Sequence, residues 1–255
     1  YAQVVTIATD QQGSLGYNTG QAVAKVANQE AGITASYFIQ TKYVRDWNDE
    51  IFFNEDTVGY VAELARMGME IGSHSVSHSR EFARFPLGTG REAYPDYIPY
   101  VLEQDRAYDA SVLGELRVSK FLLDHFSGGG QVRSFRAGHL ENPFSLPQAL
   151  AATGYRYDST MSANNTLSHL PYRLNHGRGT DAEVPVWEFP VTIEDEHEPP
   201  LPQRLDKAIA VARGIAAYGG HYVVLIHTDT LGAKLEFERR LIAALQPFSW
   251  FGSIG

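Results

Sequence analysis

The stretch Met69-Glu70-Ile71-Gly72-Ser73-His74-Ser75-Val76-Ser77-His78 joins a short apolar segment to two histidines spaced four residues apart. The apolar segment predicts a short buried strand, and the polar residues after it predict a loop. A helical turn or helix-like loop brings positions i and i+4 to one face, and neutral imidazole is a common zinc ligand. Taken alone, the stretch is either a metal-chelating loop or a polar loop that is rich in histidine.

Strands and helices are predicted to alternate on both sides of this stretch. The apolar patterns indicate strands at 4–7, 33–39, 132–135, 155–157, 187–191 and 221–226, and helices at 21–30, 57–67, 102–126, 146–153, 205–218 and 234–245. Such alternation predicts parallel strands with helical crossovers, hence a closed barrel or a doubly wound sheet. The chain length favours about seven strand–helix units over eight. Two segments without clean periodicity, 80–100 and 162–184, are expected to be long loops.

Length and composition limit the classes of function. The 255 residues, 44% of them hydrophobic, suit one large domain spanning residues 1–255. A net charge of −9 without a cluster of Lys and Arg argues against a nucleic-acid partner. No apolar run approaches the roughly 18 residues that a membrane span needs. The start in strand-like sequence, without a signal peptide, is typical of a mature form or of a domain excised from a longer protein with additional domains.

Polar residues close several of the predicted strands, where the site of a parallel barrel lies. They are Asp10, His74, His78, Arg136, Asp158 and His227. Because the chain has no cysteine, a metal would need nitrogen and oxygen ligands, and one Asp with two His and a water would complete a catalytic zinc site. His227 then remains as an imidazole suited to proton transfer near neutral pH.

The order of these residues resembles the polysaccharide deacetylase family, which is carbohydrate esterase family four, also called the NodB homology domain. The family's His-Ser/Thr-x-x-His motif is matched by residues 74–78, and its apolar strand ending in Leu-x-His is matched by Leu225-Ile226-His227. Supporting similarities lie at residues 6–13, 35–39, 135–138 and 154–160. The resemblance covers nearly the whole chain, in the family's own order.

The resemblance implies a deformed α/β barrel with about seven parallel strands that binds Zn²⁺ or another divalent transition metal. It implies removal of acetyl groups from an acetylated polysaccharide, with an N-acetyl amino-sugar polymer expected, and an exported, periplasmic or cell-envelope location. Carried over by position, the metal ligands are Asp10, His74 and His78, the general acid is His227, and Arg136 orients the general base. Asp158 either holds a histidine or substrate hydroxyl or caps a turn.

Three further residues are candidates for contact with the substrate. Tyr94 and Tyr97 lie in the first long loop, where they either stack on sugar rings or pack the loop down. Gly138 lies in the segment that resembles the family's third motif. The acidic run at 194–198 is predicted to be a solvated turn. His139 and the other loop histidines are not assigned to the metal.

The first motif departs from the family pattern, which places two carboxylates together as base and ligand. This chain has only Asp10 there, and Ala8 occupies the position expected to hold the base. The base is absent either by natural loss or by an inactivating substitution. Alternatively, Asp10 is itself the base and Gln12 is a weaker third ligand.

Two other functions compete with a deacetylase. One is a pseudoenzyme that keeps the fold and the metal but serves to bind carbohydrate. The other is a metal-free amidohydrolase that acts on a small cyclic amide, as in the allantoinase-like branch of the same fold.

Overall fold

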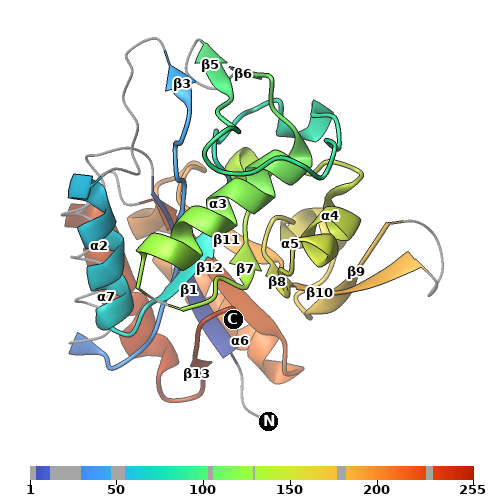
Figure 1. Cartoon of the computed structure of the whole chain (residues 1–255). Helices are drawn as coiled ribbons and strands as arrows, with labels where there is room; N and C mark the ends of the chain where they lie inside the picture. Colours follow the sequence, from blue (N-terminus) through green and yellow to red (C-terminus); the bar gives the residue numbers. More distant parts are fainter. Residues whose placement is uncertain are drawn as a thin grey trace.

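The computed structural model describes residues 4–11, 30–46, 55–102, 106–128, 130–176, 182–227 and 232–255. Its main sheet has the strand order β11-β12-β1-β2-β4-β7-β8-β10-β9, and β13 pairs with β1 (Figure 1). The bounds are β1 Val4–Gln11, β2 Ser36–Ile39, β4 Glu70–Ser73, β7 Ser134–Phe135, β8 Tyr157–Asp158, β9 Tyr172–Asn175, β10 Glu183–Glu188, β11 Val191–Glu194, β12 His221–His227 and β13 Trp250–Phe251. Neighbours from β11 to β10 pair in parallel, whereas β9 is antiparallel to β10.

Strand β12 shows why these segments form a parallel sheet. Its run of β-branched and aromatic residues is buried from His221 to Ile226, as expected for a strand with neighbours on both sides and both faces covered. It pairs with β1 on one side and β11 on the other. The register places Asp10 of β1 opposite His227, so the carboxyl ends of the two strands meet at one edge.

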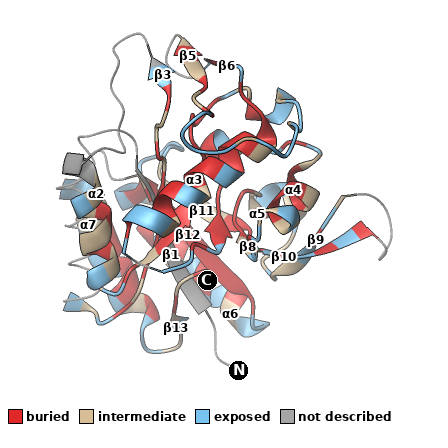
Figure 2. Ribbon diagram, viewed as in Figure 1, coloured by how far each residue is buried: buried red, intermediate tan, exposed pale blue. Residues whose placement is uncertain are grey.

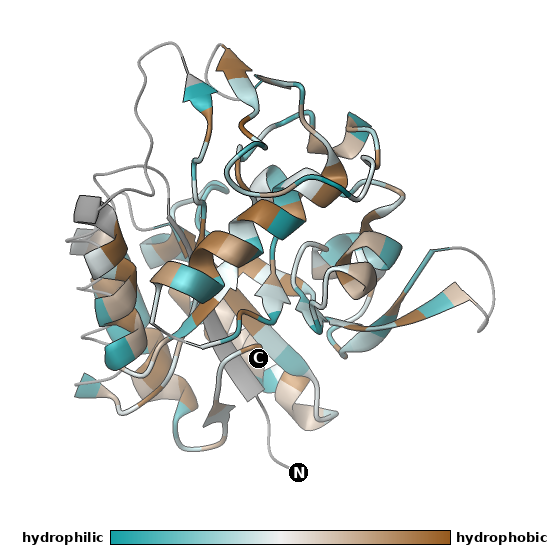
Figure 3. Ribbon diagram, in the orientation of Figure 1, coloured by the Kyte–Doolittle hydropathy of each residue, from teal (hydrophilic) through white to brown (hydrophobic). Residues whose placement is uncertain are grey.

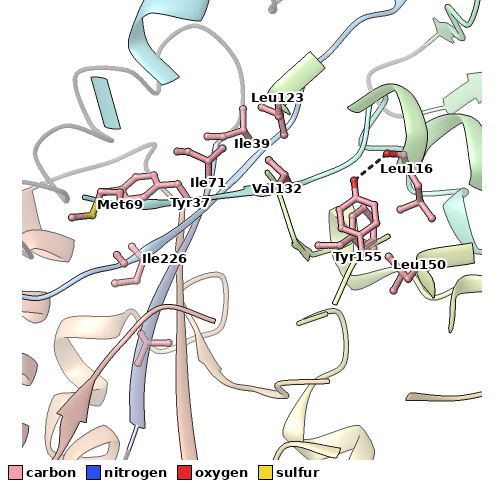
Figure 4. Packing of buried hydrophobic residues seen from close by; sticks show 14 of the residues in the cluster. Tyr37, Ile39, Met69, Ile71, Leu116, Leu123, Val132, Leu150, Tyr155 and Ile226 are labelled. Carbon is pink, nitrogen blue, oxygen red and sulfur yellow. Dashed lines mark hydrogen bonds between the residues drawn. The ribbon is translucent and has the colours of Figure 1, made fainter. Parts of the chain in front are cut away.

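Two hydrophobic layers lie on opposite faces of the sheet. Successive residues of β12 point alternately into the two layers. The layer under the helices contains Tyr222, Val224 and Ile226, and the inner layer contains Val223 and Leu225. The inner layer also contains the buried residues Phe38, Val191 and Ile254. Figure 2 shows strand β12 as largely buried, and Figure 4 shows the side chains of the layer under the helices, including the hydroxyl of Tyr155 bonded to the α3 backbone.

A single backbone bridge brings the two ends of the parallel series together. Ser162, just after β8, pairs with Val191 at the start of β11. The sheet therefore curls toward a barrel without a continuous ladder across this seam. The predicted α/β fold with a deformed parallel barrel is confirmed.

The helices are α2 Glu55–Arg66, α3 Val112–Phe126, α4 Leu146–Ala152, α5 Ala163–Thr166, α6 Leu205–Ala217 and α7 Gly232–Leu245, with 3-10 turns η2 Phe82–Arg84, η3 Gly138–Leu140 and η5 Leu201–Arg204. Among the described residues, no helix is both long and apolar enough to cross a membrane. The helix expected at 21–30 lies outside the described residues apart from its last position.

Helix α3 starts later than predicted. The side chain of Ser111 accepts a hydrogen bond from the backbone N–H of Gly114, which caps the helix at Val112. The residues before it belong to a second, three-stranded sheet made of β3 Arg45–Asp46, β5 Tyr100–Leu102 and β6 Arg106–Tyr108. Figure 3 shows hydrophobic and hydrophilic residues interspersed along α3, whose hydrophobic side packs on the sheet.

Two other predicted elements differ from the structure. The segment 162–184, expected to be a loop, contains α5, strand β9 and the first two residues of β10, which pairs antiparallel with β9. The strand expected at 187–191 is divided between the end of β10 and the start of β11. Pro190 lies between them, and because proline has no backbone N–H it does not continue a ladder.

Candidate active site

The two histidines of the 74–78 loop converge. Their ring centroids are 4.7 Å apart, and His74 and His78 are 0% and 5% exposed. The loop turns sharply because Ser75 and His78 have positive φ angles of 68° and 55°, a region that non-glycine residues rarely adopt. The two imidazoles therefore lie close together, as the spacing predicts, but through a sharp turn and not through the expected helical turn.

Hydrogen bonding and burial suit both imidazoles to metal coordination. Nδ1 of His74 lies 2.8 Å from the carbonyl oxygen of Arg136, so this nitrogen is the donor and Nε2 is the one suited to a metal. Burial lowers the pKa of His78 well below its ordinary value, and the neighbouring imidazole of His74 lowers it further. A neutral imidazole is the form that coordinates zinc.

A third imidazole packs against this pair. The ring of His139 lies 4.4 Å from that of His78, and its charge also lowers the pKa of His78. The neighbouring Gly138 leaves room for the contact, since a Cβ there would lie 2.6 Å from the His78 ring. Sequence reasoning treated His139 as an exposed loop residue; it is exposed, but it also contacts the predicted metal ligand.

His227 is held by a carboxylate that sequence reasoning missed. Oδ1 of Asp195 lies 2.7 Å from Nδ1 of His227, and Oδ2 accepts a hydrogen bond from the His227 backbone N–H at 2.9 Å. The ammonium group of Lys234 forms an ion pair with the same carboxylate. The predicted solvated turn is therefore wrong at this residue, because the Asp195 side chain is 1% exposed.

The charge of Asp195 fixes the role of each ring nitrogen. Burial on its own would raise the pKa of Asp195, but the hydrogen bonds and charges of His227 and Lys234 outweigh it and lower that pKa. An ionised Asp195 requires a proton on Nδ1 of His227. Nε2 is then the nitrogen that can exchange a proton with a substrate. The pKa of His78 also responds to His227, so the two imidazoles share one electrostatic environment.

Strand β1 lies between these two groups in the sheet order. The Asp10 backbone pairs with His227 on one side and Phe38 of β2 on the other, and Ala8 pairs with Leu225. Positions 8 and 10 fall on the same face of a strand. The side chains at both positions, on which the predicted ligand and the missing base depend, lie outside the described residues.

The described donor set fits a metal only in part. Among residues whose side chains are described, no three His, Asp or Glu side chains are close enough to hold a metal ion. His74 and His78 supply two nitrogen ligands with suitable burial and protonation. For the predicted third ligand, Asp10, only the backbone is described, and it pairs with His227. The alternative ligand, Gln12, lies outside the described residues.

Known proteins resemble this chain in structure but not detectably in sequence. No family model and no curated protein matches the sequence. A putative polysaccharide deacetylase from Mycobacterium smegmatis is similar in structure, with a TM-score of 0.66, 15% identity, and 99% of this chain and 88% of that chain covered. The chain has the fold of carbohydrate esterase family 4 domains.

Other structures with this fold include a domain of a xylanase and a pseudoenzyme. The Xyl-CE4 domain of a multidomain xylanase from the hindgut metagenome of Trinervitermes trinervoides has a TM-score of 0.59 and 14% identity, covering 100% of this chain and 88% of that one. A CE4 family pseudoenzyme from Bacillus anthracis has a TM-score of 0.53 and 9% identity, and the match covers 99% of this chain and 64% of that chain. The shared fold therefore does not decide whether this chain is active.

Arg136 is fully buried and is fixed by the segment after β8. Its Nε donates to the Ser159 carbonyl oxygen at 2.9 Å, one terminal nitrogen donates to Ser159 Oγ at 2.7 Å, and the guanidinium lies over the Phe38 ring. Its carbonyl oxygen orients His74. Arg136 thus supports the site through its backbone and anchors a neighbouring loop, while its predicted role toward a base stays a prediction.

Asp158 is paired with a second buried carboxyl group, that of Glu188. The two residues are register partners on β8 and β10, and Thr160 donates to Asp158 Oδ1 at 2.6 Å. Burial raises the pKa of Asp158 to about 6, and burial together with the Asp158 charge raises that of Glu188 well above its ordinary value. The described contacts of Asp158 support a structural role beside Arg136, not a contact with a histidine.

The two candidate tyrosines have different environments. Tyr97 is 8% exposed, and its hydroxyl donates to Oε1 of Glu115 at 3.0 Å and accepts from the Ser111 backbone at 3.1 Å. The predicted sugar contact is therefore corrected for Tyr97, which packs the loop against α3. Tyr94 is 39% exposed and stacks on Phe121, so its contact with substrate stays a prediction.

A cavity of about 600 Å³ adjoins the end of β11. Its walls combine apolar side chains with polar ones that suit hydroxyl groups, including Asn164, Asn165, Thr192 and Lys207. Glu194, which also lines it, is the residue directly before Asp195.

Proposed function

We propose that this chain is a metal-dependent deacetylase of an acetylated polysaccharide, acting on N-acetyl amino sugars in an exported or cell-envelope setting. The observation that carries the proposal is the Asp195–His227 pair, which lies within electrostatic reach of the two converging imidazoles. A proton donor beside a two-imidazole site is the arrangement that hydrolysis of an acetamide requires.

The residues divide the chemistry between them. His74 and His78, with Asp10, would hold a Zn²⁺ ion, which when bound would polarise the acetyl carbonyl. Nε2 of His227 would donate a proton to the departing amine. Asp195 holds Nδ1 and stabilises the charged imidazole that precedes this transfer. The cavity beside β11 offers polar groups for a neighbouring sugar of the polymer.

The sequence lacks a carboxylate at position 8, where the resemblance places the group that would accept a proton from the attacking water. Position 8, on the same face of β1 as position 10, carries alanine, whereas position 9 falls on the opposite face. We therefore expect weak or no turnover from the present chain. This favours one alternative, a carbohydrate-binding pseudoenzyme.

Restoring the base tests the proposal. Acetate release from acetylated chitooligosaccharides would be measured with zinc for the unchanged chain, for Ala8→Asp and, as a matched control on the opposite face, for Thr9→Asp. We expect a gain of roughly 10²-fold or more in Ala8→Asp only, the usual contribution of a general base. If both variants bind zinc and neither releases acetate, the enzyme proposal fails and the pseudoenzyme is supported. Stoichiometric zinc that is lost on His74→Ala would exclude a metal-free amidohydrolase.

A further inference from the structure

Helix α3 holds the histidine loop through one buried carboxylate. Glu115 is fully buried, and its Oε2 accepts hydrogen bonds from the backbone N–H groups of Val76 at 2.9 Å and Ser77 at 2.7 Å. These two residues lie between His74 and His78 in the chain. One carboxylate oxygen therefore fixes the peptide groups that connect the two imidazoles.

The second oxygen of this carboxylate is fixed as well. Glu115 Oε1 accepts a hydrogen bond from the Tyr97 hydroxyl, which in turn accepts one from the backbone of Ser111 at the start of α3. The preceding Gly114 leaves space for this tyrosine, because a Cβ there would lie 2.1 Å from the Tyr97 ring. The carboxyl group cannot rotate without breaking a hydrogen bond at one oxygen or the other.

The loop needs such support because its backbone is strained. Ser75 and His78 both have left-handed φ angles, and residues in that conformation persist only where their surroundings over-determine them. One turn beyond Glu115, the Ser119 hydroxyl lies 2.8 Å from that of Ser73, at the end of β4. The same face of α3 thus contacts both the end of the strand and the loop that follows it.

We infer that Glu115 is a positioning residue that holds loop 74–78 in the conformation in which the two imidazoles converge. The expected effect on zinc affinity rests on the proposed function, whereas the hydrogen bonds of Glu115 to the loop do not require a metal. The conformation of the loop and the affinity for zinc can therefore be measured separately.

The experiment compares Glu115→Ala and Glu115→Gln with Glu238→Gln. Glu238 is a matched control because it is also a buried helical glutamate, 1% exposed, on α7. Hydrogen exchange of the Val76 and Ser77 amides is followed without metal, and the zinc dissociation constant is measured by competition with a chelating dye. Circular dichroism checks that each variant is folded.

We expect Glu115→Ala to lose protection at both amides and to bind zinc about 10- to 100-fold more weakly, as is usual when a supporting partner of a metal ligand is removed. Glu115→Gln keeps one carbonyl oxygen for the two amides and an NH₂ that can donate to Tyr97, so it should fall between alanine and the unchanged chain. Glu238→Gln should behave like the unchanged chain.

A folded Glu115→Ala with unchanged amide protection and unchanged zinc affinity would overturn the inference. If Glu115→Ala does not fold, Glu115→Gln and Tyr97→Phe carry the test, and the absence of any effect in both would overturn it equally. If the unchanged chain binds no zinc, the proposed function fails, while selective loss of protection at Val76 and Ser77 would still support the positioning role.

Discussion

The paired carboxyl groups of Asp158 and Glu188 make the stability of the domain depend on pH in a defined direction. Both are buried on adjacent strands, and burial raises the pKa of Asp158 from 3.8 to about 6. The folded state therefore binds more protons than the unfolded state between these two values. Because of this, the free energy of unfolding falls as the pH rises through that window.

The size of the effect follows from the shift. A difference of about two pKa units corresponds to about 3 kcal/mol, since one unit is about 1.4 kcal/mol. Asp158→Asn keeps an oxygen that can accept the hydrogen bond from Thr160, but it cannot ionise. On raising the pH from about 4 to about 7, the unchanged chain should lose about 3 kcal/mol more stability than this variant.

Urea unfolding at several pH values between about 4 and 8 measures this difference directly. Asp206→Asn, at an exposed position in the first turn of α6, is the matched control and should follow the profile of the unchanged chain. The raised pKa of Glu188 makes the free energy of unfolding continue to fall at pH values above the window of Asp158. Glu188→Gln should therefore reduce this pH dependence at the alkaline end of the range. Parallel profiles for Asp158→Asn and the unchanged chain would refute this reasoning.

Two further predictions concern the site itself. Gly138→Ala places a Cβ about 2.6 Å from the His78 ring, so we expect it to displace the ring, to cost about 1–3 kcal/mol in urea unfolding, and to weaken zinc binding in a dye competition assay. Unchanged zinc affinity would show that this contact does not position the ligand. Asp195→Asn removes one member of a buried ion pair and should cost about 3 kcal/mol at pH 7. Because folding lowers the pKa of Asp195, its ionised form stabilises the folded state at neutral pH, and this contribution is lost as the pH falls below about 4. The cost of Asp195→Asn should therefore shrink there, and a cost that persists would contradict an ionised Asp195.

Features that depend on neighbouring residues could be predicted from the sequence. The spacing of positions 74 and 78 predicts that the two histidines converge, although the turn that joins them uses positive φ angles and is not helical. Strand β12 forms because its apolar run is long and rich in β-branched residues. The sequence predicts that Asp10 and His227 share one edge of the sheet, because each lies at the end of a parallel strand, but not that they are register partners. The start of α3 was predicted too early, because the β5–β6 hairpin is stabilised by partners far away in the sequence, including β3.

The supporting carboxylates could not be predicted in this way. Asp195 belongs to an acidic run that is typical of a solvated turn, and it is buried only because β11 pairs with β12 and extends it toward His227, 32 residues later. Glu115 contacts the histidine loop across 38 residues of chain. In both cases the signal is a tertiary contact, and a charged residue in a helix or turn gives no local sign of being buried.

The sheet order separates position 8 from the described groups of the proposed site. Strand β1 lies between β12, which carries His227, and the β2–β4 pair, which leads into His74 and His78. His227 is held by Asp195, directly after β11, and the 74–78 loop is held by Glu115 of α3 and by the carbonyl oxygen of Arg136, directly after β7. None of these contacts involves the side chain at position 8. In the proposed site, β1 would supply the ligand Asp10 and, at position 8, the acceptor for the proton of water. If the proposed function holds, a carboxylate at position 8 should therefore restore turnover without changing the contacts of His74, His78 or His227, whereas a carbohydrate-binding pseudoenzyme would stay inactive.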